Sequence, residues 1–111
     1  MAIQEWSEDI IVADLADDPQ FSDQLTTLTE KLADRPRNVV LNFASVGFVN
    51  SSNIARLLQM RKKMISSDYR LMLCDVNSQV WGILAVTGLD KIFDHTNDVA
   101  TALASLQLSS V

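Results

Sequence analysis

The stretch NVVLNFASVGFVNSSNI, residues 38–54, decides the expected fold. Its first six residues form a β-branched and aromatic run, apolar on both faces at its centre, as in a buried parallel strand. The polar tetrad Asn50-Ser51-Ser52-Asn53 follows, and apolar residues at helical spacing come after it. Because Asn and Ser are preferred helix N-caps, the tetrad predicts a turn from a strand into a helix.

Outward from this stretch, strand and helix patterns alternate along the chain. We expect other strands at residues 3–6, 10–15, 69–74 and 91–93, the first two joined by a turn at residues 7–9. The predicted order is β-β-α-β-α-β-α-β-α. It indicates an α/β fold with a four- to five-stranded, mostly parallel sheet, an N-terminal hairpin and about four helices. We expect a single domain over residues 1–111, since this length suits one core.

Each predicted helix has an apolar stripe. Asp18 is expected to cap the first helix, with Pro19 at its first helical position and residues 34–36 at its end. Asn77 or Ser78 is expected to cap the third helix, and Gly88 to close it in a left-handed turn. Arg61 interrupts the stripe of the second helix and is expected at the edge of the core. The stripes are Phe21, Leu25, Leu28 and Leu32; Ile54, Leu57, Leu58, Met64 and Ile65; Val80, Ile83 and Leu84; and Val99, Leu103 and Leu106.

Composition excludes several classes of function. A net charge of −5 argues against nonspecific binding to nucleic acid or to an anionic membrane. The single His95 and single Cys74 cannot form a His/Cys zinc site, and no glycine-rich phosphate loop is present. We expect Cys74 to be a buried small hydrophobe and His95 to lie exposed in a polar turn. The chain is therefore predicted to need no cofactor or metal and not to be an enzyme.

The chain also lacks an apolar run that resembles a signal peptide or is long enough to span a bilayer. With one cysteine, it cannot form an internal disulfide. A cytoplasmic location, without insertion into a membrane, is the expectation that fits both features.

The tetrad has two interpretations on its own residues. The free N–H groups and the dipole of a helix N-terminus favour negative charge, so a phosphate on Ser51 would be stabilised there. The added charge would also repel a partner that fits a neutral hydroxyl. Alternatively, the tetrad only caps the helix.

Two motifs resemble the STAS domains of the SpoIIAA-like anti-sigma factor antagonist family. One is residues 39–54, where an apolar strand and a short link precede the tetrad, which stands at the place of the family's Asp-Ser-Ser/Thr-Gly. The other is Thr87-Gly88-Leu89-Asp90-Lys91-Ile92-Phe93, similar to the family's Ser/Thr-Gly-Leu stretch. The resemblance covers residues 39–106 well and the earlier part of the chain poorly.

The resemblance implies a binding protein whose partner is an anti-sigma factor, a serine kinase of the histidine-kinase-like ATPase type. Ser51 is then the expected phosphorylation site, with Ser52 as the alternative. Asn50 replaces the family's Asp and Asn53 its Gly, which leaves open a second function: a phosphorylation-independent scaffold or sensor module, in a signalling assembly or as a transporter accessory. A homo-oligomer is compatible with both the antagonist function and the scaffold or sensor function. The expected partner-binding residues are Asp18, Asn50, Ser51, Ser52, Asn53, Arg56 and Trp81.

Trp81 and the basic residues of the second helix are further candidates for an interface. Trp81 lies about 100° around its helix from the apolar stripe, so it is either an exposed interface anchor or a cover for a neighbouring loop or the hairpin. Arg56, with Arg61, Lys62 and Lys63, makes the second helix basic, either as a contact surface or as a solvated face. Trp6 is interpreted as ordinary packing.

Overall fold

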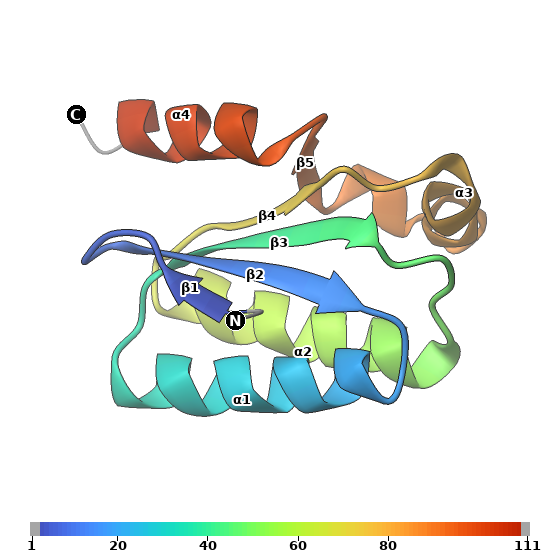
Figure 1. Cartoon of the computed structure of the whole chain (residues 1–111), viewed down its shortest axis with the longest axis horizontal. Coiled ribbons are helices and arrows are strands. Elements are labelled where there is room, and N and C mark those ends of the chain that lie inside the picture. Colours follow the sequence, from blue (N-terminus) through green and yellow to red (C-terminus); the bar gives the residue numbers. More distant parts are fainter. Residues whose placement is uncertain (1–2, 110–111) are drawn as a thin grey trace.

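A computed structural model describes residues 3–109 as a five-stranded sheet with helices on both faces (Figure 1). The element bounds are β1 Ile3–Glu5, β2 Ile10–Ala16, α1 Gln20–Asp34, β3 Asn38–Ser45, α2 Ser51–Ser66, β4 Leu71–Cys74, α3 Ser78–Val86, the 3-10 helix η1 Leu89–Lys91, β5 Asp94–Thr96 and α4 Val99–Ser109. The order matches the expected alternation, with η1 added before the last strand.

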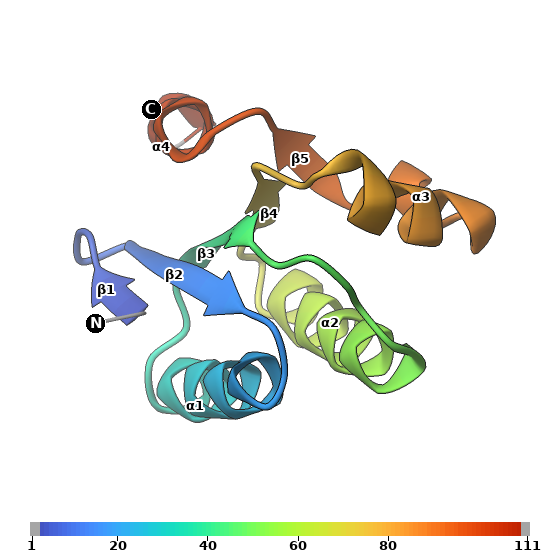
Figure 2. The same cartoon turned by 45° about the vertical axis from the view of Figure 1, so that its right-hand side comes forward.

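The strands lie in the spatial order β1-β2-β3-β4-β5. β1 pairs antiparallel with β2 as the predicted hairpin, and every later pair is parallel. Because each parallel crossover moves to the next strand in the same direction, right-handed connections place α1 and α2 on the same face. Figure 2 shows these two helices together beneath the sheet and α4 on the opposite side.

Alternate strand residues form two apolar clusters, one on each face. The larger cluster joins Leu41 and Phe43 of β3 to α1, α2 and α3. The smaller one joins Val40 of β3 and Cys74 of β4 to Ala102 and Leu106 of α4. The run in β3 is therefore apolar on both faces because helices cover both.

Several predicted strand boundaries are wrong, and the strand expected at residues 69–74 begins only at Leu71. Residues 91–93 are not the edge strand: they end η1 and lead into β5, which begins at Asp94. Phe93 is buried and joins the larger cluster, so its apolar character comes from the core and not from strand pairing. The first strand also ends at Glu5, and Trp6, expected to pack, is exposed.

Two details of the helices also differ from expectation. Gln20 begins α1, and Pro19 stands at the N-cap, one position before the place predicted for it. On α2, Ile65 is exposed, whereas Met60 is buried. Arg61 does lie at the core edge: its Nε donates to the Ile92 carbonyl at 3.2 Å, and its guanidinium lies 5.9 Å from the Phe93 ring centroid.

Candidate functional site

The tetrad begins α2, as its sequence predicted, and its two asparagines form a reciprocal cap. Asn50 is the N-cap, in extended conformation, and its Oδ1 accepts from the Asn53 backbone N–H at 2.8 Å. The Asn53 Oδ1 accepts from the Asn50 backbone N–H at 3.0 Å. This is a capping box, in which two N–H groups left free at a helix start are satisfied together.

Asp18 joins this cap to the start of α1. Its Oδ2 accepts from Asn53 Nδ2 at 2.9 Å and from Asn50 Nδ2 at 3.4 Å. Its Oδ1 accepts from the backbone N–H and the hydroxyl of Ser22, at 2.9 and 2.8 Å. The hydrogen bond from Asn53, followed by those from Ser22, lowers the pKa of the Asp18 carboxyl below its usual value, so it is ionised at neutral pH.

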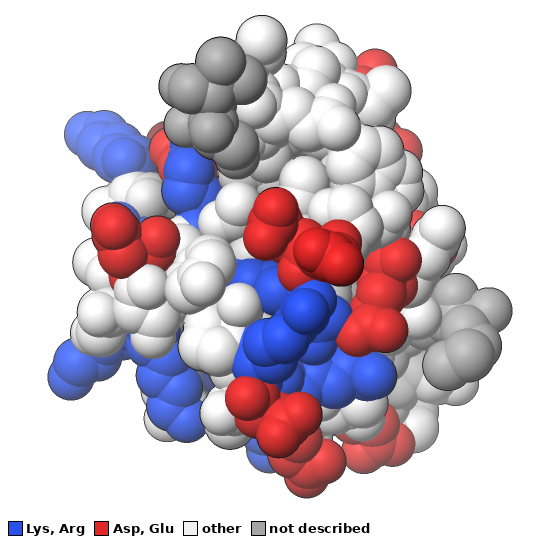
Figure 3. Space-filling model, turned by 90° about the vertical axis from the view of Figure 1, so that its left-hand side faces the viewer, with Lys and Arg blue, Asp and Glu red and all other residues white. Residues whose placement is uncertain are grey.

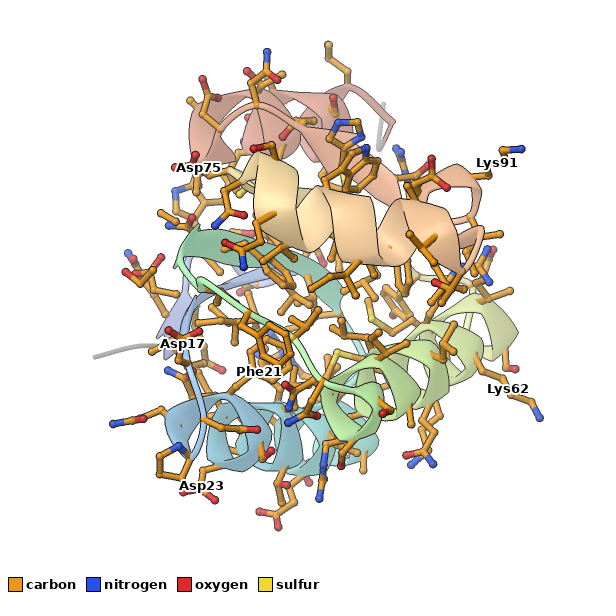
Figure 4. All side chains as sticks on the ribbon, turned by 90° about the vertical axis from the view of Figure 1, so that its right-hand side faces the viewer. Asp17, Phe21, Asp23, Lys62, Asp75 and Lys91 are labelled. Carbon is orange, nitrogen blue, oxygen red and sulfur yellow. The ribbon has the colours of Figure 1, made fainter. Side chains whose placement is uncertain are left out.

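A second aspartate fixes the link between β3 and α2. The Asp17 Oδ1 accepts from the backbone N–H groups of Gly47 and Phe48, at 2.9 and 3.3 Å. On the other side of the link, Asn77 Nδ2 donates to the Val46 carbonyl at 2.9 Å. Figure 4 looks onto this end of the molecule, with Asp17 after β2 and Asp75 after β4. The link is thus held from β2 and from α3.

This arrangement exposes one aromatic ring beside the tetrad. Val46 and Val49 are buried, whereas the Phe48 side chain between them is 57% exposed. Asp17 and Phe48 are not among the predicted site residues, and Asn77 was predicted only as a cap of the third helix. The aspartate and the asparagine bind backbone groups about thirty residues away, which no local pattern indicates. Strict alternation would bury Phe48 together with Val46, so no local pattern indicates the exposure of Phe48 either.

Ser51 and Ser52 are the first two residues of α2, and both are exposed. Within residues 3–109 neither hydroxyl has a hydrogen-bond partner. Asn53, by contrast, is 2% exposed. The arrangement therefore presents two free hydroxyls on a helix N-terminus whose neighbouring asparagines are fixed by Asp18.

The remaining predicted site residues lie at different distances from the tetrad. Arg56 is exposed one turn along α2, and its guanidinium donates to Thr26 Oγ1 of α1 at 3.2 Å. Trp81 lies on α3, half-buried, with its ring centroid 4.3 Å from that of His95. Trp81 therefore covers β5 and not the hairpin. His95 is exposed as expected, but it belongs to a strand and not to a turn.

Further features concern metal binding, the reactivity of the single cysteine and the length of the helices. Among the described residues, no group of three or more His, Cys, Asp and Glu side chains is arranged to hold a metal ion. Cys74 is buried as predicted, and burial, with the nearby Asp75, Asp14 and Asp98 charges, raises its thiol pKa to about 12. No helix within residues 3–109 has both the length and the apolar character needed to cross a membrane.

Comparisons with known proteins agree with the fold. A family model described as STAS domain matches residues 11–102, and no curated protein sequence matches. A Thermotoga maritima structure, described as that of a candidate anti-sigma factor antagonist, has a TM-score of 0.81 at 16% identity, over 91% of this chain and 90% of that one. The phosphorylated form of the Bacillus cell fate determinant SpoIIAA has a TM-score of 0.73 at 13% identity, over 93% and 96%. A serine-to-glutamate variant of Moorella thermoacetica RsbS has a TM-score of 0.84 at 14% identity, over 97% and 95%.

Proposed function

The chain belongs to the STAS domain family, and from that premise we propose that it is an anti-sigma factor antagonist controlled by phosphorylation of Ser51. Its partner is an anti-sigma factor that is a serine kinase of the histidine-kinase-like ATPase type, and the complex controls transcription. The chain acts by binding and is not an enzyme. The observation that carries the proposal is the exposed Ser51 hydroxyl at the N-terminus of α2, which has no hydrogen-bond partner among the described residues.

Local electrostatics support a switch at this position. The first backbone N–H groups of α2 and its dipole stabilise a phosphate on Ser51 without unfolding the helix. The ionised Asp18, fixed to Asn50 and Asn53, leaves the same surface strongly negative once a phosphate of about −1.5 to −2 charges is added. A partner adapted to the neutral serine is then repelled. Ser52 is the alternative acceptor, since it is exposed too.

We define the switch surface as the exposed residues around the start of α2: Asp18, Phe48, Asn50, Ser51, Ser52 and Arg56. Phe48 supplies an exposed aromatic ring of the kind that anchors protein interfaces. Asn53 is too deeply buried to offer much contact area, so its role is to position Asn50 and Asp18. Trp81, half-buried against His95, is proposed as a separate partner contact on α3.

The test uses the full chain, a serine kinase of this type from the same genome, and ATP. We expect mass spectrometry to place one phosphate on Ser51, and Ser51→Ala to lose it. Ser51→Asp should abolish binding to the kinase in a pull-down, whereas Ser51→Ala should keep it. Ser78→Asp is the matched control, because Ser78 too is the exposed first residue of a helix with an Asn N-cap. This variant should keep binding to the kinase. Absence of phosphate on Ser51 and Ser52 with an active kinase would refute the proposal.

A second function, a scaffold or sensor module independent of phosphorylation, is favoured by one observation. The replacement residues Asn50 and Asn53 bind each other and Asp18, which gives the helix start a structural role of its own. This function predicts a homo- or hetero-oligomer that is unchanged by Ser51→Asp. Chromatography with light scattering on the wild type and Ser51→Asp separates the two functions.

A further inference from the structure

An open groove of about 620 Å³ lies between the C-terminal halves of α1 and α2, far along α2 from Ser51. Its buried floor includes Met60 and Met64. Leu32, Pro36 and Tyr69 line its sides. A smaller extension of about 170 Å³ shares Met60 with it and continues along the helices toward Arg56. The groove is therefore mostly apolar and reaches back toward the switch surface.

The rim of the groove is positively charged although the chain carries a net charge of −5. Lys62 and Lys63 line the groove, and both are exposed. Within the described part of the chain, neither lysine forms an ion pair. Arg37 also lines the groove, but it is buried and bound to Glu5, so its charge is already balanced. In Figure 3, which shows this end of the molecule, basic groups lie beside acidic groups as well as uncharged surface.

We propose that this groove binds a long-chain carboxylic acid, with the alkyl chain over Met60 and Met64 and the carboxylate at Lys62 and Lys63. Flexible methionines adapt to an alkyl chain, and lysines bind an anion as mobile point charges. The C-terminus of α2 carries a partial negative charge of about half a unit, which opposes binding of an anion. The two lysine charges exceed it, so a carboxylate is still attracted to this end of the groove.

The dimensions of the groove favour a small amphiphile over a docked protein. Its volume lies within the range of about 300–1,000 Å³ that is usual for small-molecule sites. Only thirteen residues line it, whereas a stable protein interface uses about 20–30 residues on each side. The inference does not depend on phosphorylation, and its test leaves Ser51 unchanged.

The test is a titration of the full chain with dodecanoate, below its critical micelle concentration, followed by ¹H–¹⁵N NMR. We expect saturable shifts at residues 29–37 and 59–69. The double variant Lys62→Glu, Lys63→Glu should weaken binding about tenfold or more, because it replaces attraction by repulsion. Lys91→Glu is the single-charge control, since Lys91 is exposed and lies outside the groove. It should leave the affinity for dodecanoate unchanged. Figure 4 shows Lys62 and Lys91 extending from different elements.

A steric variant tests the groove independently of charge. Ala33 is exposed on α1 and lines the groove, so Ala33→Trp should fill it and abolish the shifts. Ala104→Trp, on the exposed side of α4, should not. Three outcomes would overturn the proposal: no saturable shift with monomeric dodecanoate, equal effects of both Trp variants, or binding only to anionic phosphatidylglycerol vesicles. The last outcome would make the groove a membrane contact.

Discussion

At the scale of single residues, Asp18, Asn50 and Asn53 act as one hydrogen-bonded unit. Asp18 and both asparagines were predicted as site residues, the asparagines as part of the tetrad and Asp18 because the resemblance to STAS domains implies it. It did not predict the bonds between them, since Asp18 and Asn53 lie thirty-five residues apart and meet only through the parallel sheet. The contribution of these hydrogen bonds to the stability of the protein can therefore be measured separately from partner binding.

Replacing Asn53 by the glycine usual in the family should destabilise this protein. Asn53→Gly removes the bonds to Asp18 and to the Asn50 N–H, and we expect it to lower the free energy of unfolding by about 2–3 kcal/mol. Ala55→Gly, at an exposed position of the same helix, measures the effect of glycine alone, about 1 kcal/mol. Urea denaturation of both variants checks this. Equal losses would show that the capping box contributes nothing.

The Asp18 carboxylate should make stability depend on acid pH. Its pKa is lowered in the folded protein, chiefly by Asn53, so its contribution is complete above the usual Asp pKa, 3.8. The contribution is lost as pH falls through the lower, folded pKa. The difference in free energy of unfolding between wild type and Asp18→Asn should therefore shrink as the pH falls below 3.8. A difference that stays constant over this range would contradict the assignment.

At the scale of elements, apolar spacing predicted the buried helices better than the edge strand. The stripe of α1 was found because Phe21, Leu25 and Leu28 are all buried against the sheet. β5 was misplaced because its own residues, Asp94–Thr96, are polar, and an edge strand with an exposed side does not need an apolar pattern. The turn before it was predicted correctly, because Gly88 does adopt a left-handed conformation, with φ of 76°.

The two glycines of this region should respond to alanine in opposite directions. Gly88→Ala forces a Cβ into left-handed backbone, and we expect a loss of about 1–2 kcal/mol. At Gly82, inside α3, an added Cβ would meet no described residue beyond its chain neighbours and its own helix backbone within 4 Å, so Gly82→Ala should stabilise the protein by about 0.4–1 kcal/mol. Thermal and urea unfolding of each variant provide the measurement. A gain with Gly88→Ala would exclude the left-handed turn.

At the scale of the whole molecule, the sheet connects two surfaces with different chemistry. The switch surface follows from the carboxyl ends of the parallel strands, where sequence analysis placed the tetrad. The groove between α1 and α2 was not predicted, because it depends on how far apart two packed helices lie and not on any local pattern. Both surfaces rest on one sheet, whose central strands are buried on both faces.

Cys74 offers a direct measure of whether this sheet opens as one unit. It ends β4, fully buried beneath α4, and its thiol pKa is raised to about 12, so both burial and protonation suppress its reactivity. If exposure of the thiol requires global unfolding, labelling by a disulfide reagent at pH 8 should be slower than in the urea-unfolded chain by at least about a thousandfold. The rate should also rise with urea at the slope of global unfolding. Fast labelling without that dependence would mean that α4 detaches from the sheet while the opposite core stays folded.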